Sequence, residues 1–107
     1  MNTSSPAKIA RTWHGLVPEE KADAYYRYLL KTGVKDYRSI KGNCGVKVLR
    51  RNENGRTHFL LITLWDSYAS IRDFAGDNIA QARYYPEDSD YLLELEPHVT
   101  HYEVLPI

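Results

Sequence analysis

Histidine, arginine and aromatic residues are the side chains in this sequence that could bind a ligand and move a proton. The four histidines are His14, His58, His98 and His101. Histidine changes its charge near neutral pH, which suits a general base, and a buried arginine stabilises a developing anion. We expect the catalytic groups to be Arg11, His14 and His101, and the spacing leaves open which histidine acts as the base.

Aromatic residues are numerous for a chain of 107 residues, with nine tyrosines, two tryptophans and two phenylalanines. A tyrosine ring is apolar but its hydroxyl needs a partner, so such rings suit a half-wet cleft or an interface. We expect a small aromatic or hydrophobic ligand to contact Trp13, His58, Trp65, Phe74, Tyr84 and Tyr85. The alternative is an aromatic-rich core in which these rings only pack against one another.

The sequence does not favour a metal site or a bound cofactor. His98 and His101 are three residues apart on an expected strand and therefore point to opposite faces. Neither a His-Glu-x-x-His nor a Cys-x-x-Cys pattern occurs, and the glycine-rich dinucleotide fingerprint is absent. Cys44 is the only cysteine, so no intrachain disulfide can form, and no neighbour in the sequence activates its thiol.

Length and charge narrow the class of protein further. A chain of this length suits one domain, which we expect at residues 8–107 behind a flexible arm at residues 1–7. The 14 basic and 14 acidic residues balance, so no net positive field attracts a nucleic acid or an anionic membrane. The polar start MNTSSPAK does not read as a signal peptide, and the apolar run FLLITLW is too short to span a bilayer. We therefore expect a cytoplasmic protein with no membrane partner.

Hydrophobic periodicity and turn residues predict the order β-α-β-β-α-β, which is the ferredoxin-like arrangement. In this α+β sandwich, helices cover one face of a four-stranded antiparallel sheet. The expected strands span residues 9–16, 45–51, 57–65 and 98–105, with Asn54-Gly55 as a type I′ turn between the second and third. The first expected helix runs from Pro18 to a stop at Gly33 and has Ala22, Tyr25, Tyr26 and Leu29 on one face. The other expected helical segments are one from Asp66 or Ser67 to Gly76, a short piece from Asp77 to about Arg83, and a turn within 86–97. Residues 34–42 are expected to be a connector.

The strand at residues 57–65 is apolar on both of its faces. One face carries Phe59, Leu61, Thr63 and Trp65. The other face carries Leu60, Ile62 and Leu64. A strand with one face in water should instead alternate between apolar and polar residues. Helices cover one face only, so we expect a second copy of the chain to cover the other, giving a homodimer.

Three stretches of the chain resemble the antibiotic biosynthesis monooxygenase family. They are IARTWHG, ITLWDSYASIRDFAGD and ARYYPEDSDYLLELEPHVTHYEV, and the resemblance runs over about residues 8–105. The tryptophan that ends the third strand, followed by a serine-started helix and a phenylalanine, is its most shared part. The resemblance implies two ferredoxin-like chains forming a dimeric α+β barrel, and either cofactor-independent oxidation of phenols or haem degradation.

The residues match the haem-degrading branch poorly. That branch uses an asparagine on the first strand, and none occurs at residues 8–16, where Arg11 is nearest. Its tryptophan and histidine positions fall on Phe74 and Tyr84. The resemblance therefore favours a cofactor-independent monooxygenase acting on an aromatic or quinol-like substrate. A non-catalytic dimeric module that binds a small molecule or a partner is the alternative.

Overall fold

A computed structural model of the chain describes residues 7–107, so the arm expected at 1–7 lies, except for Ala7, outside the described residues. The four strands are β1 (Ile9–Pro18), β2 (Asn43–Glu53), β3 (Arg56–Trp65) and β4 (Thr100–Glu103). The helices are α1 (Ala22–Lys31), α2 (Gly33–Ser39) and α3 (Tyr68–Ala75), with short 3₁₀ turns at Glu19–Lys21 and Asp88–Asp90.

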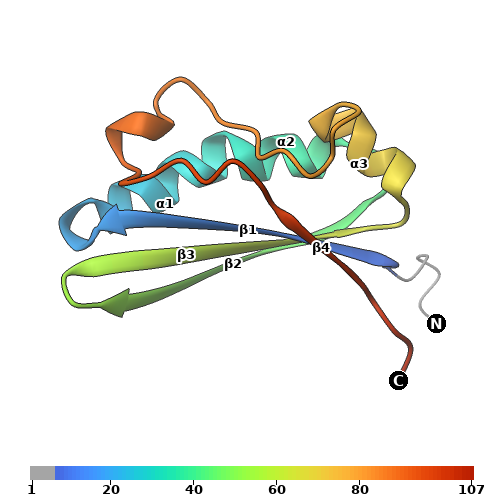
Figure 1. The fold of residues 1–107 in the computed structure, drawn as a ribbon, viewed down its shortest axis with the longest axis horizontal. Coiled ribbons are helices and arrows are strands. Elements are labelled where there is room, and N and C mark those ends of the chain that lie inside the picture. The colour runs from blue at the N-terminus through green and yellow to red at the C-terminus, as the bar shows by residue number, and fades with distance from the viewer. Residues whose placement is uncertain (1–6) are drawn as a thin grey trace.

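The strands form one antiparallel sheet in the order β2-β3-β1-β4, and the three helices lie on one face of it (Figure 1). This confirms the predicted α+β ferredoxin-like fold. In the register of β1 against β3, Ile9 pairs with Trp65, Arg11 with Thr63, and Trp13 with Leu61. Because paired residues point to the same face, these side chains all face the helices.

Local signals explain where several elements begin and end. Asn54 and Gly55 have φ angles of 53° and 77°, as the predicted tight turn between β2 and β3 requires. The hydroxyl of Ser67 accepts a hydrogen bond from the Ser70 N–H and so caps the start of α3. Gly76, at φ 83°, ends α3 in a conformation that other residues rarely adopt.

Four details of the sequence prediction were wrong. Residues 33–39 form α2 rather than a connector, because Val34 and Tyr37 find buried contacts that the local sequence does not reveal. Tyr26 is exposed, since the buried face of α1 is limited to Ala22, Tyr25 and Leu29. Residues 77–83 form no helix and contribute only an isolated bridge from Gln81 to His98. The last strand is also shorter than expected, since regular pairing with β1 is limited to residues 100–103.

The two faces of the sheet differ. The helix-facing side contains the hydrophobic core, in which Val17, Phe59 and Trp65 are completely buried. The opposite face includes Leu49 and Leu60, which are 46% and 36% exposed. No element of residues 7–107 covers this opposite face, called the open face below (Figure 1). Within the same residues, no helix is long and apolar enough to cross a membrane.

Candidate functional site

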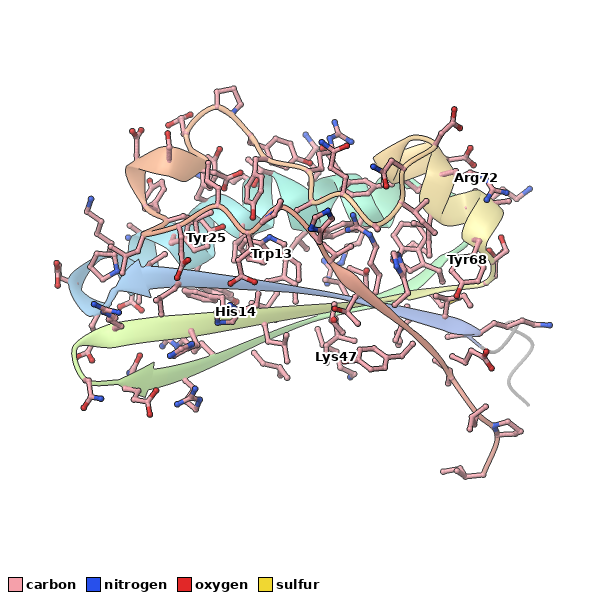
Figure 2. The ribbon with its side chains drawn as sticks, in the orientation of Figure 1. Trp13, His14, Tyr25, Lys47, Tyr68 and Arg72 are labelled. Carbon is pink, nitrogen blue, oxygen red and sulfur yellow. The ribbon has the colours of Figure 1, made fainter. Side chains whose placement is uncertain are left out.

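A small cavity lies between the sheet and the helices, where β1 and β3 face α1, α2 and the irregular chain at 83–88. Figure 2 shows Trp13 and Tyr25 in this layer. The side chains that line it from the sheet and helices include Arg11, Trp13, Tyr25, Tyr37 and Leu61, and those from the irregular chain are Arg83, Tyr84, Tyr85 and Asp88. Its volume is about 20 Å³, measured for the centre of a water-sized molecule, which is room for roughly one water.

Arg11 is the buried cationic group of this cavity, which the exposed Arg83 also lines. Its side chain projects from β1 toward the helices and is only 2% exposed. The Nη2 atom donates to the carbonyl oxygen of Gln81 at 3.2 Å, and the guanidinium lies 5.4 Å from the centre of the Phe74 ring. Among residues 7–107, Arg11 Nε is a buried donor without a hydrogen-bond partner. Burial lowers the pKa of Arg11, and the Tyr37 hydroxyl partly opposes this shift.

Asp88 supplies a carboxylate to the same cavity. It is 4% exposed, and it accepts hydrogen bonds from the Tyr85 N–H at 2.6 Å and from the Tyr25 hydroxyl at 3.3 Å. Burial raises the pKa of Asp88, although these two donors favour its ionised form. A buried carboxyl with a raised pKa can accept a proton nearer to neutral pH than an exposed one can.

A hydrogen-bonded pair of rings closes another side of the cavity. The Trp13 Nε1–H donates to the Tyr84 hydroxyl at 3.1 Å, and that hydroxyl donates to the carbonyl oxygen of Glu96 at 2.6 Å. The neighbouring Tyr85 hydroxyl donates to Asp36. These bonds tie the irregular segment after α3 to β1 and to α2, so they fix the position of this wall of the cavity.

The structure separates the predicted site residues into three groups. Arg11, Trp13, Tyr84 and Tyr85 line the cavity together. Trp65 and Phe74 lie in the core beside it, each in contact with Tyr37. The third group is the histidines.

None of the predicted histidines lines the cavity. His14 and His58 lie on the open face, and their ring nitrogens are 2.9 Å apart. His101 lies opposite Arg11 across β1 and β4, and its ring packs edge-on against Tyr68. Burial lowers the pKa of His101, and the charge of Arg11 lowers it further.

The sequence prediction missed five polar residues of the cavity, namely Tyr25, Thr32, Tyr37, Arg83 and Asp88. Tyr25 was identified only as a member of a helix face, and Tyr37 lay in an expected connector. Asp88 belongs to the run PEDSD, in which nothing distinguishes it from its exposed acidic neighbours. The predicted turn of helix in this region does occur at Asp88–Asp90, and it turns the Asp88 carboxylate inward.

The site combines one buried cation, one buried carboxyl and several phenol hydroxyls within aromatic walls. Such a set can stabilise an anionic oxygen and exchange a proton with it. Across the described part of the chain, no cluster of three or more histidine, cysteine, aspartate or glutamate residues is placed to hold a metal ion.

Asp88 should make the folded protein less stable as the pH rises. Because burial raises its pKa above the ordinary 3.8, the folded state binds this proton more tightly than the unfolded chain does. The resulting stabilisation is complete below the ordinary pKa and is lost as the pH rises through the raised one. Urea unfolding between about pH 4 and 7 measures this effect. The free energy of unfolding should fall less with rising pH in Asp88→Asn than in the wild type. The exposed Asp90→Asn should behave as wild type, and equal slopes in all three proteins would contradict this.

Comparison with solved structures identifies proteins of the same fold. A Bacillus cereus protein described as a "putative antibiotic biosynthesis monooxygenase" superposes with a TM-score of 0.66 at 13% identity, covering 95% of this chain and 97% of its own. A Nitrosomonas europaea protein with the same description gives 0.65 at 16% identity, with 95% of both chains covered.

A second Nitrosomonas europaea protein, of unknown function, gives a TM-score of 0.63 at 16% identity over 94% of this chain and 92% of its own. No family model and no curated protein matches the sequence. The chain thus has the α+β ferredoxin-like fold of structures described as antibiotic biosynthesis monooxygenases, which agrees with the resemblance seen in its sequence.

Proposed function

We propose that the protein is a cofactor-independent monooxygenase that oxidises a small aromatic or quinol-like substrate with molecular oxygen in the cavity between sheet and helices. The observation that carries the proposal is the buried Arg11, which lines an aromatic cavity with an unpartnered Nε. Burying a guanidinium that no carboxylate neutralises is unfavourable for the fold alone. A ligand with an anionic oxygen would supply the missing partner.

The cavity residues suit the two protein-dependent steps of such a reaction. Asp88 would accept the proton of the substrate, and Arg11 would stabilise the resulting anion. The electron-rich anion can pass one electron to dioxygen, and recombination of the two radicals forms a carbon–oxygen bond in a hydroperoxide. Loss of water then leaves a carbonyl group on a ring carbon that carried two hydrogens. One oxygen atom enters the product, the other leaves as water, and the substrate supplies every electron.

Substrate entry requires the irregular segment at 83–88 to move outward. The cavity of about 20 Å³ is too small for an aromatic ring. The segment is held mainly by side-chain hydrogen bonds from Tyr84 and Tyr85, and it lacks regular backbone pairing. Few backbone bonds would therefore have to break when a ligand enters.

The same small volume favours a second candidate, a non-catalytic dimeric module that binds a small molecule or a partner. The polar atoms of Trp13, Tyr84 and Trp65 already have partners inside the chain. On this alternative, the aromatic residues serve packing, and Arg11 and Asp88 hold the irregular segment in place.

Oxygen consumption by metal-stripped protein separates the two candidates. The substrates would be a panel of anthrones, naphthols and hydroquinones, and each rate is compared with the rate without protein. Uptake above that background, with one labelled oxygen atom from ¹⁸O₂ in the product, supports the monooxygenase. No uptake from any compound, together with a thermal shift by some of them, supports the binding module. If no compound causes oxygen uptake and none causes a thermal shift, both ligand-based proposals are excluded.

We also propose that the protein is a homodimer in which the open faces of two sheets pack together. The face carries Leu49 and Leu60 as cross-strand partners, with Ile62 and Leu64 further along β3. Burial of such an apolar face is the main driving force for association. The balanced charge of the chain does not oppose it.

Leu60→Asp should abolish this dimer without unfolding the chain. Leu60 is partly exposed in the single chain, but in the dimer an aspartate there would lose its hydration among the apolar side chains of the interface. We expect the dimer Kd from sedimentation equilibrium to rise by more than about a hundredfold. Leu93→Asp is the matched control, because Leu93 is 50% exposed and lies in the irregular segment, outside the sheet. Equal dimerisation of both variants would place the interface elsewhere.

A further inference from the structure

Within residues 7–107, two buried side-chain nitrogen atoms lack a hydrogen-bond partner, and they belong to neighbouring residues of the sheet. They are Arg11 Nε and His101 Nε2. Arg11 and His101 are direct cross-strand partners in the antiparallel pairing of β1 with β4. A buried polar atom without a partner destabilises the fold, so two such atoms on paired residues call for a common explanation.

The strand pairing brings both side chains to the same side of the sheet. Direct cross-strand partners project from one face, with their Cβ atoms about 5 Å apart. Arg11 faces the helices, and so does His101, whose ring packs edge-on against Tyr68 of α3 with ring centres 6.0 Å apart. Arg11 Nε and His101 Nε2 are also separated from their own Cβ atoms by the same number of bonds. One small atom placed between the two side chains can therefore contact both nitrogens.

Arg11 always donates from Nε, whereas His101 has a choice. Burial lowers the pKa of His101 and the charge of Arg11 lowers it further, so the uncharged ring is favoured. A neutral imidazole has one N–H group and one lone pair, and the group bound beside it decides which nitrogen carries the hydrogen. An anionic oxygen only accepts hydrogen bonds, so it selects the form of His101 with hydrogen on Nε2.

The chemistry of this pair indicates the class of ligand atom that it suits. A cation is repelled by Arg11, and an apolar group leaves both nitrogens without a partner. A carbonyl or phenolate oxygen accepts two hydrogen bonds and so satisfies both nitrogens at once. Two donors aimed at one oxygen are also the arrangement that stabilises negative charge developing on a carbonyl oxygen.

We propose that Arg11 Nε and His101 Nε2 together bind the anionic oxygen of the ligand, with neutral His101 as the second hydrogen-bond donor. The inference rests on the proposed function and adds His101 to the role given there to Arg11. When Asp88 takes a proton from the ring carbon of a substrate such as an anthrone, the electron pair of that C–H bond shifts onto the carbonyl oxygen of the substrate. The two donors hold this oxygen until the electron-rich ring passes an electron to dioxygen. His101 is thus a donor that neither gains nor loses a proton.

Titration with 4-nitrophenol, followed by the absorbance of its phenolate, tests this site without requiring a reaction. We expect the Kd of the phenolate to rise by about 10–100-fold in His101→Phe, which keeps an aromatic ring but has no donor. The ionised fraction of the bound ligand at a fixed pH should fall as well, which a loss of packing alone would not cause. His101→Gln should restore most of the binding, because its amide nitrogen can donate in place of Nε2. His98→Phe is the matched control, since His98 is exposed and outside the pair.

Three results would overturn the inference: no binding by the wild type, equal binding by the wild type and His101→Phe, or equal losses in His101→Phe and His101→Gln. Imidazole ¹⁵N chemical shifts of the complex give an independent measure, because hydrogen on Nε2 of His101 supports the site and hydrogen on Nδ1 contradicts it.

The oxygen uptake measurement separates this inference from the proposed function. Uptake that is the same in the wild type and His101→Phe would contradict the role of His101 but not the monooxygenase. Binding of the phenolate that depends on His101, without uptake from any compound of the panel, would support the two-donor site and contradict the monooxygenase.

Discussion

Replacing Trp65 with alanine should lower the free energy of unfolding by about 3–5 kcal/mol. The Trp65 side chain is completely buried at the end of β3, and its Nε1–H donates to the Thr63 hydroxyl at 2.8 Å. Its ring centre lies 6.3 Å from those of both Tyr37 and Phe74. Truncation leaves a cavity that the rigid sheet cannot close, so both the transfer energy of the ring and its packing contacts are lost.

Urea unfolding followed by circular dichroism measures this loss, and Leu93→Ala provides the control. Leu93 is 50% exposed, so its truncation should change the free energy of unfolding by no more than about 0.5 kcal/mol. A loss below about 1 kcal/mol in Trp65→Ala, combined with weaker ligand binding, would instead assign the ring to the ligand site. The result therefore decides between the two roles that the sequence leaves open for this tryptophan.

Replacing Arg11 with methionine should reduce oxygen uptake by about 10²–10³-fold while leaving the fold as stable as before or more stable. Methionine keeps the length and most of the volume of the side chain but cannot stabilise an anion. It also removes a buried guanidinium that no carboxylate of residues 7–107 neutralises. Stability gained at the expense of activity is the behaviour expected of a group retained for function.

The matched control for this variant is Arg72→Met, because Arg72 is exposed on α3 and remote from the cavity (Figure 2). It should keep both the wild-type oxygen uptake and the wild-type unfolding curve. If the wild type consumes no oxygen, binding of an anionic phenol such as 4-nitrophenol replaces the activity measurement. A large loss of stability in Arg11→Met with unchanged activity or binding would show that Arg11 serves the fold alone.

Local sequence signals were sufficient for most of the framework. Partial alternation of apolar residues locates β1, a continuous apolar run locates β3, and Asn54-Gly55 specifies the turn between β2 and β3. Ser67 and Gly76 mark the ends of α3. Each signal acts within a few residues, through backbone conformation or a nearby hydrogen bond, so a single sequence is enough to read it.

The site depended more on contacts between distant parts of the chain. Strand alternation alone places Arg11 and Trp13 on one face of β1 and His14 on the other. It did not place the cavity's carboxyl, because Tyr25 and Asp88 are 63 residues apart and meet only when the irregular segment folds over the helices. An acidic run such as PEDSD gives no local indication of which carboxylate will be buried.

By itself, therefore, the sequence determined the order of the elements, the two apolar faces of β3 and the aromatic character of the space beside it. These properties follow from residue type and from the two-residue period of a strand. Only the tertiary structure decided that His14 meets Glu96 across 82 residues of chain and that Arg11 shares its cavity with Asp88. Those arrangements depend on how the segment after α3 returns across the helices, and the physical reason is that packing, not local conformation, selects its path.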